Sequence, residues 1–359
     1  MFFGKFLRSK AFEIIFMIFV IASMFYVTNR LSLLIEAFFN INPSLVIFII
    51  LVVLLGYMLL YIKSKKEIKR TRNLYEFCSV IVCFLLHFVM SLWIYDILNL
   101  FLKLNDKWYL LVVIIAIIIT FYGFIHAKKL DIKEYDLKLN KNKKLALISD
   151  IHAGKFVDFK QLSKIVNKIN ELDVDYLLIA GDLFDVDAYE YCNKDEIIKI
   201  LNKLKVKEKM YAILGNHDPS SKTNIMREFY NQTKIKLLID EINEENDIIF
   251  IGRDDITTNP KRLALNQLIK DNHKLKIVLD HNPLGIDEAI TNNIDIILMG
   301  HTHKGQFFPA NIFTKLAYGD SYYGYHVKDN THMITSSGAG YFQMPMRTLS
   351  NSEIVLINI

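Results

Sequence analysis

The stretch IDIILMGHTHKGQFFP (residues 294–309) changes character abruptly in its middle. Five of the six residues in 294–299 are apolar, as in a short buried strand, and the letters GHTH follow at 300–303. The chain has only ten histidines, and two of them, His301 and His303, stand one residue apart where this strand is predicted to end. Taken alone, the run is equally compatible with a polar loop and with a functional site, so the rest of the chain has to distinguish the two.

The same pattern recurs along the second half of the chain. Short apolar runs alternate with two segments, 158–171 and 195–204, whose apolar residues recur at the intervals of a helix. This alternation predicts an α/β domain with buried strands. Each of five apolar runs leads directly to Asp, Asn or His residues, often beside a glycine: Asp150 and His152, Asp182, Asn216 and His217, His281, and His301 with His303. Ligand sites in open α/β sheets form outside the carboxyl ends of the strands, so we expect these loops to converge on one site.

The residue types at these strand ends indicate a metal site. They offer carboxylate, amide and imidazole donors and no cysteine, which favours divalent Mn, Fe, Zn or Co over a thiolate zinc site or an iron–sulfur cluster. Seven candidate donors are too many for one ion, whereas two ions that share a bridging carboxylate would have four each. Two such ions, ~3.5–4 Å apart, can hold both oxygens of a displacement at phosphorus and lower the pKa of a bound water.

The ordered series D-x-H, G-D, G-N-H-D, H and G-H-T-H resembles the calcineurin-like metallophosphoesterase superfamily over about residues 140–359. The resemblance implies an α/β fold, a four-layer αββα sandwich in which two packed mixed sheets are flanked by helices. It also implies the ligands of two metals: Asp150, His152 and His303 for the first, Asn216, His281 and His301 for the second, and Asp182 as the bridge. His217 would contact the phosphoryl oxygens and protonate the leaving oxygen, and a metal-bridging hydroxide would be the nucleophile.

Two further segments resemble a bacterial membrane-associated branch of that superfamily, which includes phosphoesterases with N-terminal transmembrane helices. They are GHTHKGQFFP at 300–309 and TSSGAG…PMR at 335–347. Lys304 replaces the usual glycine, and GYFQMPMR departs from the expected aromatic–Gly–Pro pattern. Some members of the branch hydrolyse the pyrophosphate of a UDP-diacylglucosamine lipid precursor. A shared fold does not settle a substrate, so a lipid-linked and a soluble phosphoester both stay open.

The first third of the chain predicts a membrane region. Four apolar runs, at roughly 11–28, 44–62, 77–102 and 108–126, each approach the ~17–25 residues that cross a bilayer as a helix. A cleaved signal peptide is not expected, because three further runs follow the first. We therefore predict a membrane domain with four transmembrane helices at 1–127, a linker and edge strand at 128–144, and a metallophosphoesterase domain at 145–359.

The basic residues predict the orientation in the membrane. They gather before the first run, between the second and third at 63–72, and after the fourth, which predicts a multi-pass protein of the cell membrane with both termini and the catalytic domain in the cytoplasm. Residues 1–130 carry 14 basic and 6 acidic side chains, and the rest of the chain carries 29 and 32. The net charge of +5 therefore comes from the basic residues that flank the predicted membrane helices, and no nucleic-acid partner is expected.

Two classes of function remain. The first is a membrane-bound phosphoesterase whose partners are membrane lipid and a phosphoester substrate. The second is a membrane sensor or binding module with a non-catalytic phosphoesterase domain. A domain that had lost catalysis should have lost ligands, and all seven candidate ligands are present, which favours the enzyme.

Overall fold

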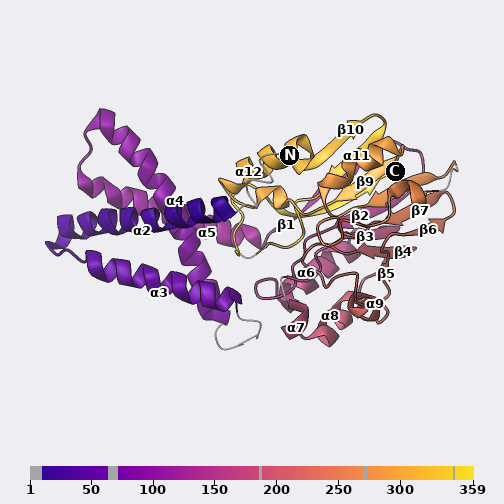
Figure 1. Ribbon diagram of the computed structural model, residues 1–359, viewed down its shortest axis with the longest axis horizontal. Helices are drawn as coiled ribbons and strands as arrows, with labels where there is room; N and C mark the ends of the chain where they lie inside the picture. The colour runs from indigo at the N-terminus through magenta and orange to yellow at the C-terminus, as the bar shows by residue number, and fades with distance from the viewer. Residues whose placement is uncertain (1–9, 64–71, 186–187, 270–272, 343) are drawn as a thin grey trace. The chain divides into compact units, whose positions relative to one another are not determined.

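The computed structural model describes residues 10–63, 72–185, 188–269, 273–342 and 344–359. The chain forms two compact units, which divide between His126 and Ala127. The first is helical and the second contains all the strands of the described chain (Figure 1).

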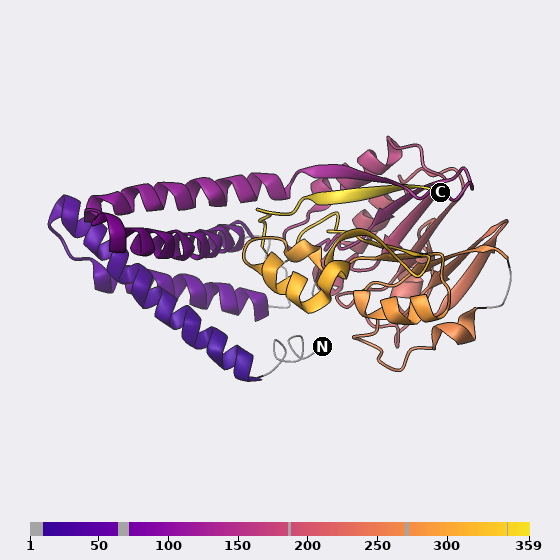
Figure 2. The same ribbon diagram turned by 90° about the horizontal axis from the view of Figure 1, so that it is seen from above.

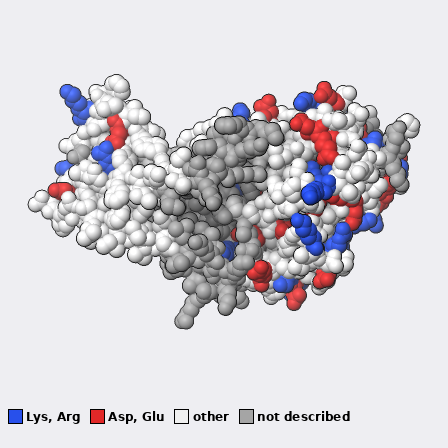
Figure 3. Space-filling view, viewed as in Figure 1, with Lys and Arg blue, Asp and Glu red and all other residues white. Residues whose placement is uncertain are grey.

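The first unit consists of long apolar helices: α2 (Lys10–Phe39), α3 (Ser44–Lys63), α4 (Arg72–Leu102), the short 3-10 turn η2 (Asp106–Trp108) and α5 (Tyr109–Ala127). Three helices are long and apolar enough to cross a membrane, over Ile18–Phe39, Phe77–Leu102 and Tyr109–Ala127. Within the described residues, the predicted run at 44–62 contributes a shorter apolar stretch, Ser44–Gly56. The prediction of an apolar helical region is therefore confirmed for three candidate spans rather than four. Figure 3 shows few charged side chains on the described surface of this unit.

The first span lies further along the chain than predicted. The first apolar run was predicted to end near residue 28, but α2 continues to Phe39 and includes Arg30. Asp96 of α4 lies 2.6 Å from the Arg30 guanidinium and also accepts a hydrogen bond from the Tyr26 hydroxyl. A charge within an apolar helix is tolerated when it is paired, so this contact allows the helix to run past Arg30. Because the partner is 66 residues away, nothing local in the sequence revealed it.

The second unit contains two six-stranded mixed sheets. The first has the order β1 (Leu130–Asp136), β12 (Ser352–Asn358), β2 (Lys144–Ile148), β3 (Tyr176–Ala180), β4 (Lys209–Ile213), β5 (Lys236–Leu237). The second has the order β10 (Gly324–Lys328), β11 (Thr331–Thr335), β9 (Ile296–Met299), β8 (Leu275–Leu279), β7 (Ile248–Gly252), β6 (Glu241–Glu245). Neighbouring strands are parallel except in the pairs β12–β2, β6–β7 and β10–β11. Figure 2 shows the parallel pair β1 and β12 side by side.

The main core lies between the two sheets. Leu147 and Leu178 of the first sheet share one apolar cluster with Phe250, Ile277 and Leu298 of the second. The strands are apolar on both faces because helices cover their outer sides, which is why they appear in the sequence as continuous apolar runs. The α/β prediction is confirmed as two mixed sheets with helices.

The helices of this unit are mostly short. The helices α6 (Phe159–Asn170) and α8 (Lys194–Leu201) each bury one apolar face, and α11 (Ile286–Thr291) packs against the second sheet through Ile286 and Ala289. Figure 1 shows α6, α8 and α9 beside the first sheet and α11 beside β9. The remaining elements are α7 (Ala188–Tyr191), α9 (Ile225–Tyr230), α10 (Leu265–Leu268), η3 (Pro283–Gly285), η4 (His303–Gly305), α12 (Ala310–Tyr318) and η5 (Gly319–Tyr322).

Candidate metal centre

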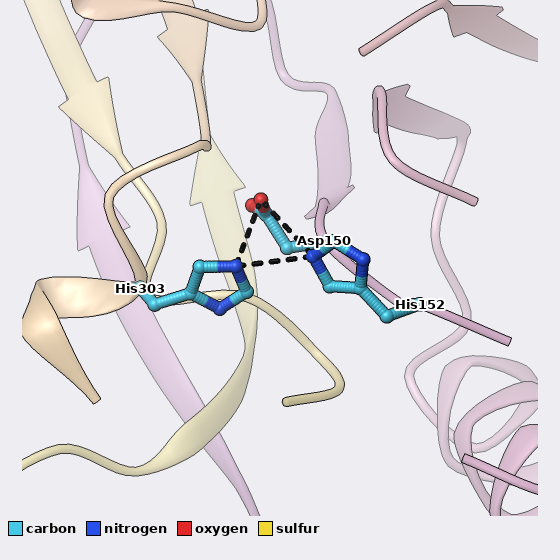
Figure 4. Close-up of side chains that lie close together, drawn as sticks. All are labelled: Asp150, His152 and His303. Atoms are coloured by element: carbon cyan, nitrogen blue, oxygen red, sulfur yellow. Dashed lines mark hydrogen bonds and ion pairs between the residues drawn. The ribbon is translucent and has the colours of Figure 1, made fainter. Parts of the chain in front are cut away.

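The predicted donors follow the carboxyl ends of five strands, and the structure brings them together. Asp150 and His152 follow β2, Asp182 follows β3, Asn216 follows β4, His281 follows β8, and His301 and His303 follow β9. Two groups of donor atoms lie within 4.8 Å of one another: Asp150 with His152 and His303, and Asp150 with Asp182 and His281. Figure 4 shows the first group, in which both imidazole rings turn toward the Asp150 carboxylate. We call the edge of the sheets where these strands end the site edge.

The first group has the spacing of ligands around one ion. The Nε2 atoms of His152 and His303 are 3.1 Å apart, and His303 Nε2 is 3.4 Å from Asp150 Oδ1. His152 Nε2 is 3.7 Å from Asp182 Oδ2. Metal–ligand bonds of about 2.0–2.2 Å in tetrahedral geometry place neighbouring ligands about 3.3–3.6 Å apart. The observed separations therefore fit a shared cation without movement of the backbone.

The second group includes Asp182 and His281, and Asn216 and His301 lie next to it. His281 Nε2 is 3.2 Å from the same Asp182 Oδ2 atom and 3.2 Å from Asn216 Oδ1. His301 Nδ1 is 2.8 Å from Asn216 Oδ1. One carboxylate oxygen of Asp182 thus faces imidazoles of both groups, which is the position that a bridging ligand requires. Asp150 also reaches toward both groups, because its Oδ1 atom is 4.0 Å from His281 Nε2.

Burial keeps the imidazoles of the first group neutral. It lowers the pKa of His152 to about 3 and the pKa of His303 well below its usual value. A neutral imidazole presents one nitrogen with a lone pair, which is the form that binds a metal. In the second group, His281 Nδ1 lies 2.7 Å from the Ala180 carbonyl oxygen. This contact places the proton on Nδ1 and turns Nε2 toward the site.

The carboxylates make the site favourable for positive charge. Burial opposes ionisation of Asp182, but the neighbouring His281 outweighs it and holds the pKa of Asp182 below its usual range. Burial raises the pKa of Asp150 to about 6. Burial also lowers the pKa of His281, but Asp182 outweighs this and raises that pKa well above its ordinary value. A cation at this position is therefore electrostatically stabilised.

The backbone at the site edge is sharply turned. Five candidate ligands have left-handed φ angles, between 49° and 71°: Asp150, His152, Asp182, His301 and His303. Asp and His enter this region more readily than most residues, and such conformations cluster at functional sites. The turn directly after each strand points the donor back over the end of the sheet.

Steric crowding explains why glycine stands beside the donors. A Cβ atom at Gly215 would overlap the Asp182 carboxylate, and one at Gly300 would overlap that of Asp150. A side chain at either position would occupy the space of a donor atom. This accounts for the glycine that accompanies several of the strand ends in the sequence.

His217 lies beside the two groups and belongs to neither. Its backbone N–H donates a hydrogen bond to Asp182 Oδ1 at 2.8 Å, and its ring centroid is 5.2 Å from that of His152. Burial lowers the pKa of His217, and the negative charge of a bound phosphoester would oppose this shift and favour the protonated ring. Its position fits a group that meets a substrate bound next to the donors.

One aromatic side chain was not predicted at the site. The ring of Phe342, in the loop between β11 and β12, lies 4.6 Å from the ring of His217, 5.1 Å from that of His152 and 6.1 Å from that of His303. Gln306 holds it in place, because its side-chain amide donates to the Phe342 carbonyl at 3.1 Å and accepts from its N–H at 2.8 Å. Both residues belong to segments noted above, but no local pattern in the sequence indicates that they meet.

The segment formed by residues 335–342, together with Arg347, packs against the backbone of Asp150 and Ile151. A Cβ atom at Gly340 would overlap the Ile151 carbonyl, so the loop can approach this closely only with glycine there. The buried Arg347 closes the loop by donating to the carbonyls of Ser337 at 2.7 Å and Gly340 at 2.6 Å. The segment therefore supports the site and supplies no donor.

Lys304 occupies a left-handed backbone position, with φ 53° and ψ 28°. Glycine adopts this conformation without strain, which explains why a glycine is usual here. The Lys304 ammonium lies 4.1 Å from the centroid of the Tyr323 ring. The substitution thus adds a cation over the Tyr323 ring, and the adjacent His303 stays in its donor group.

The site and the fold together define an α/β protein with a buried carboxylate–imidazole centre at its strand ends. The family model for calcineurin-like phosphoesterases matches residues 143–305, a range that runs from β2 to β9 and contains all the candidate donors. An uncharacterized metallophosphoesterase of Helicobacter pylori is 30% identical over 62% of this chain and 61% of its own. One from Campylobacter jejuni is 28% identical over 73% and 71%. A transmembrane protein with metallophosphoesterase domain from Danio rerio is 30% identical over 69% and 61%. The chain thus spans about six-tenths of the length of the first of these relatives.

Proposed function

We propose that the second unit is a two-metal phosphoesterase. The observation that carries this proposal is the position of Asp182 Oδ2, 3.7 Å from His152 Nε2 and 3.2 Å from His281 Nε2. Asp150, His152 and His303 would hold one divalent ion, Asn216, His281 and His301 would hold the other, and Asp182 would be shared between them. The donor set suits Mn, Fe, Zn or Co.

The chain's own residues then position the substrate and move a proton. Two bound ions polarise the phosphoryl oxygens and lower the pKa of a bound water. Asp182 fixes the separation of the two halves of the site, and its Oδ1 atom orients the backbone of His217 through a 2.8 Å hydrogen bond. The His217 ring binds a phosphoryl oxygen and donates a proton to the leaving oxygen. Phe342 shields the donors on that side from water.

The proposed substrate is a lipid-linked phosphoester or pyrophosphate, such as a UDP-diacylglucosamine-like precursor. Support comes from the connection between the units: α5 ends at Ala127 and β1 begins at Leu130. So short a connection keeps the domain at the membrane surface, where the phosphate of a lipid headgroup lies. The sensor alternative has less support, because all seven donors are present and six of them belong to close donor pairs.

The test is a substrate panel on the purified full-length protein in lipid vesicles. We expect metal-dependent release of product from a lipid pyrophosphate in the same vesicles, and slower turnover of nitrophenyl esters and cyclic nucleotides. Turnover of soluble esters alone would support the proposal of a phosphoesterase and contradict the proposal of a lipid-linked substrate. A metal-loaded protein inactive on every member of the panel would favour the sensor.

We also propose that the domain faces the cytoplasm. The support is the distribution of basic residues in the sequence, including Lys128 and Lys129 immediately after α5. A reporter that is active only in the cytoplasm, fused after Ile359, should be active, and a reporter that needs an extracytoplasmic location should be silent. The reverse pair of results would place the domain outside and contradict the proposal.

A further inference from the structure

Helix α12 (Ala310–Tyr318) is rich in apolar residues but buries none of its side chains. Ile312 is 46% exposed and Leu316 is 63% exposed. These two residues are one turn apart and share a face of the helix. A helix on the surface of a water-soluble domain normally turns its apolar face toward the core, so α12 has the opposite arrangement.

The helix lies at the site edge. It begins seven residues after His303, and the ring of Tyr318 at its end is 5.9 Å from the ring of His301. Other exposed apolar side chains lie at this edge as well: Leu284 directly follows the His281 segment, and Leu349 precedes β12.

The membrane-connected end of the domain lies at the same edge. Strand β12 pairs antiparallel with β2, with Val355 opposite Leu147, so its first residue Ser352 lies where β2 ends and Asp150 follows. Leu130, the first residue of β1, pairs with Ser352. The chain that arrives from α5 therefore joins the domain beside the candidate ligands, and not at the far end of the sheet.

Hydrogen bonds fix this junction to the site. The Ser352 hydroxyl lies 3.1 Å from the carbonyl oxygens of both Ala127 and Gly340. The Gly340 N–H donates to the Asp150 carbonyl at 3.0 Å. The last residue of α5 is thus connected to a candidate metal ligand through two intervening residues.

We propose that the site edge is the surface through which the domain binds the bilayer, with α12 lying in the lipid interface. Ile312 and Leu316 would enter the acyl region, and Lys128, Lys129 and Lys315 would meet anionic headgroups. The tyrosines that follow the helix, Tyr322 and Tyr323, suit the interface, where such rings are enriched. Membrane binding by this surface does not depend on catalysis and extends the proposed function.

The experiment places a single fluorescent probe on this surface in the full chain. The protein has two tryptophans, Trp93 and Trp108, and both are replaced by phenylalanine. Leu316→Trp is then introduced, and the protein is reconstituted into nanodiscs that contain anionic lipid, either ordinary or brominated near the headgroup end of the acyl chains. We expect blue-shifted emission from position 316 and loss of that emission with the brominated lipid.

Val327→Trp is the matched control. Val327 is 54% exposed, and it pairs with His332 near the start of β11, at the edge opposite the site. Its emission should resemble that of tryptophan in water and should be insensitive to bromination. Equal quenching at positions 316 and 327, or water-like emission at both, would overturn the proposal. Matching melting temperatures confirm that both variants are folded, and no outcome depends on activity.

Discussion

Asp182→Asn should lower the rate of phosphoester hydrolysis by on the order of 10³-fold or more. Metal ions contribute several kcal/mol to stabilising the transition state, and about 4 kcal/mol corresponds to about 10³ in rate. Asp182 Oδ2 faces imidazoles of both groups, so the substitution removes an anionic ligand from two ions at once. Elemental analysis of the same variant should show reduced content of both ions.

Asp218→Asn is the matched control for this variant. Asp218 is also buried beside the site, but its two oxygens accept hydrogen bonds from the backbone of Gly215 and Phe184, each at 3.0 Å. Burial raises the pKa of Asp218 to about 7. Asn keeps one of the two acceptors and loses the other, so the variant perturbs a buried carboxyl beside the site without removing a proposed ligand. The control should keep its metals and most of its activity. If Asp182→Asn kept full activity and metal content, Asp182 would not be a bridging ligand.

His217→Ala should retain both ions and lose rate by about 10²–10⁴-fold, the usual contribution of a positioned acid or base. The ring lies outside both donor groups, so its removal leaves the ligands in place. Esters with good leaving groups need less protonation in the transition state. They should therefore lose less rate than esters with poor leaving groups when the variant and the parent are compared.

Two measurements separate the possible roles of His217. His326→Ala removes a histidine from β10, away from the strand-end donors, and should leave rate and metal content unchanged. Equal losses across all leaving groups would remove the acid role of His217 and leave a role in binding phosphate. Loss of metal from His217→Ala would show instead that the residue is a ligand.

The strands and donors were predictable because their signals are local. Each strand is a short apolar run, and each donor stands within four residues of its end, so the sequence predicts both the element and the edge. Parallel strands bring those edges together regardless of the connecting helices. The glycines at 215 and 300 belong to the same local pattern, since their lack of a Cβ leaves room for the neighbouring carboxylates.

The features that escaped prediction depend on distant contacts. Phe342 reaches the His152 ring across 190 positions of sequence, and Arg30 meets Asp96 across 66. No periodicity or motif encodes such pairs, because they arise only when the strands and helices have packed. The left-handed backbone of the ligands is likewise set by the packed strand ends, and Asp or His types alone do not specify it.

The measurement that tests the central claim most directly is the metal content of the purified full-length protein. After reconstitution with Mn, Zn, Fe or Co and removal of free metal, elemental analysis should find about two ions per chain, as a two-metal site requires. The ions should leave together when Asp182 is changed to Asn, and the Asp218→Asn control should retain them. A folded protein that binds no metal, or that saturates at one ion, would contradict the two-metal account.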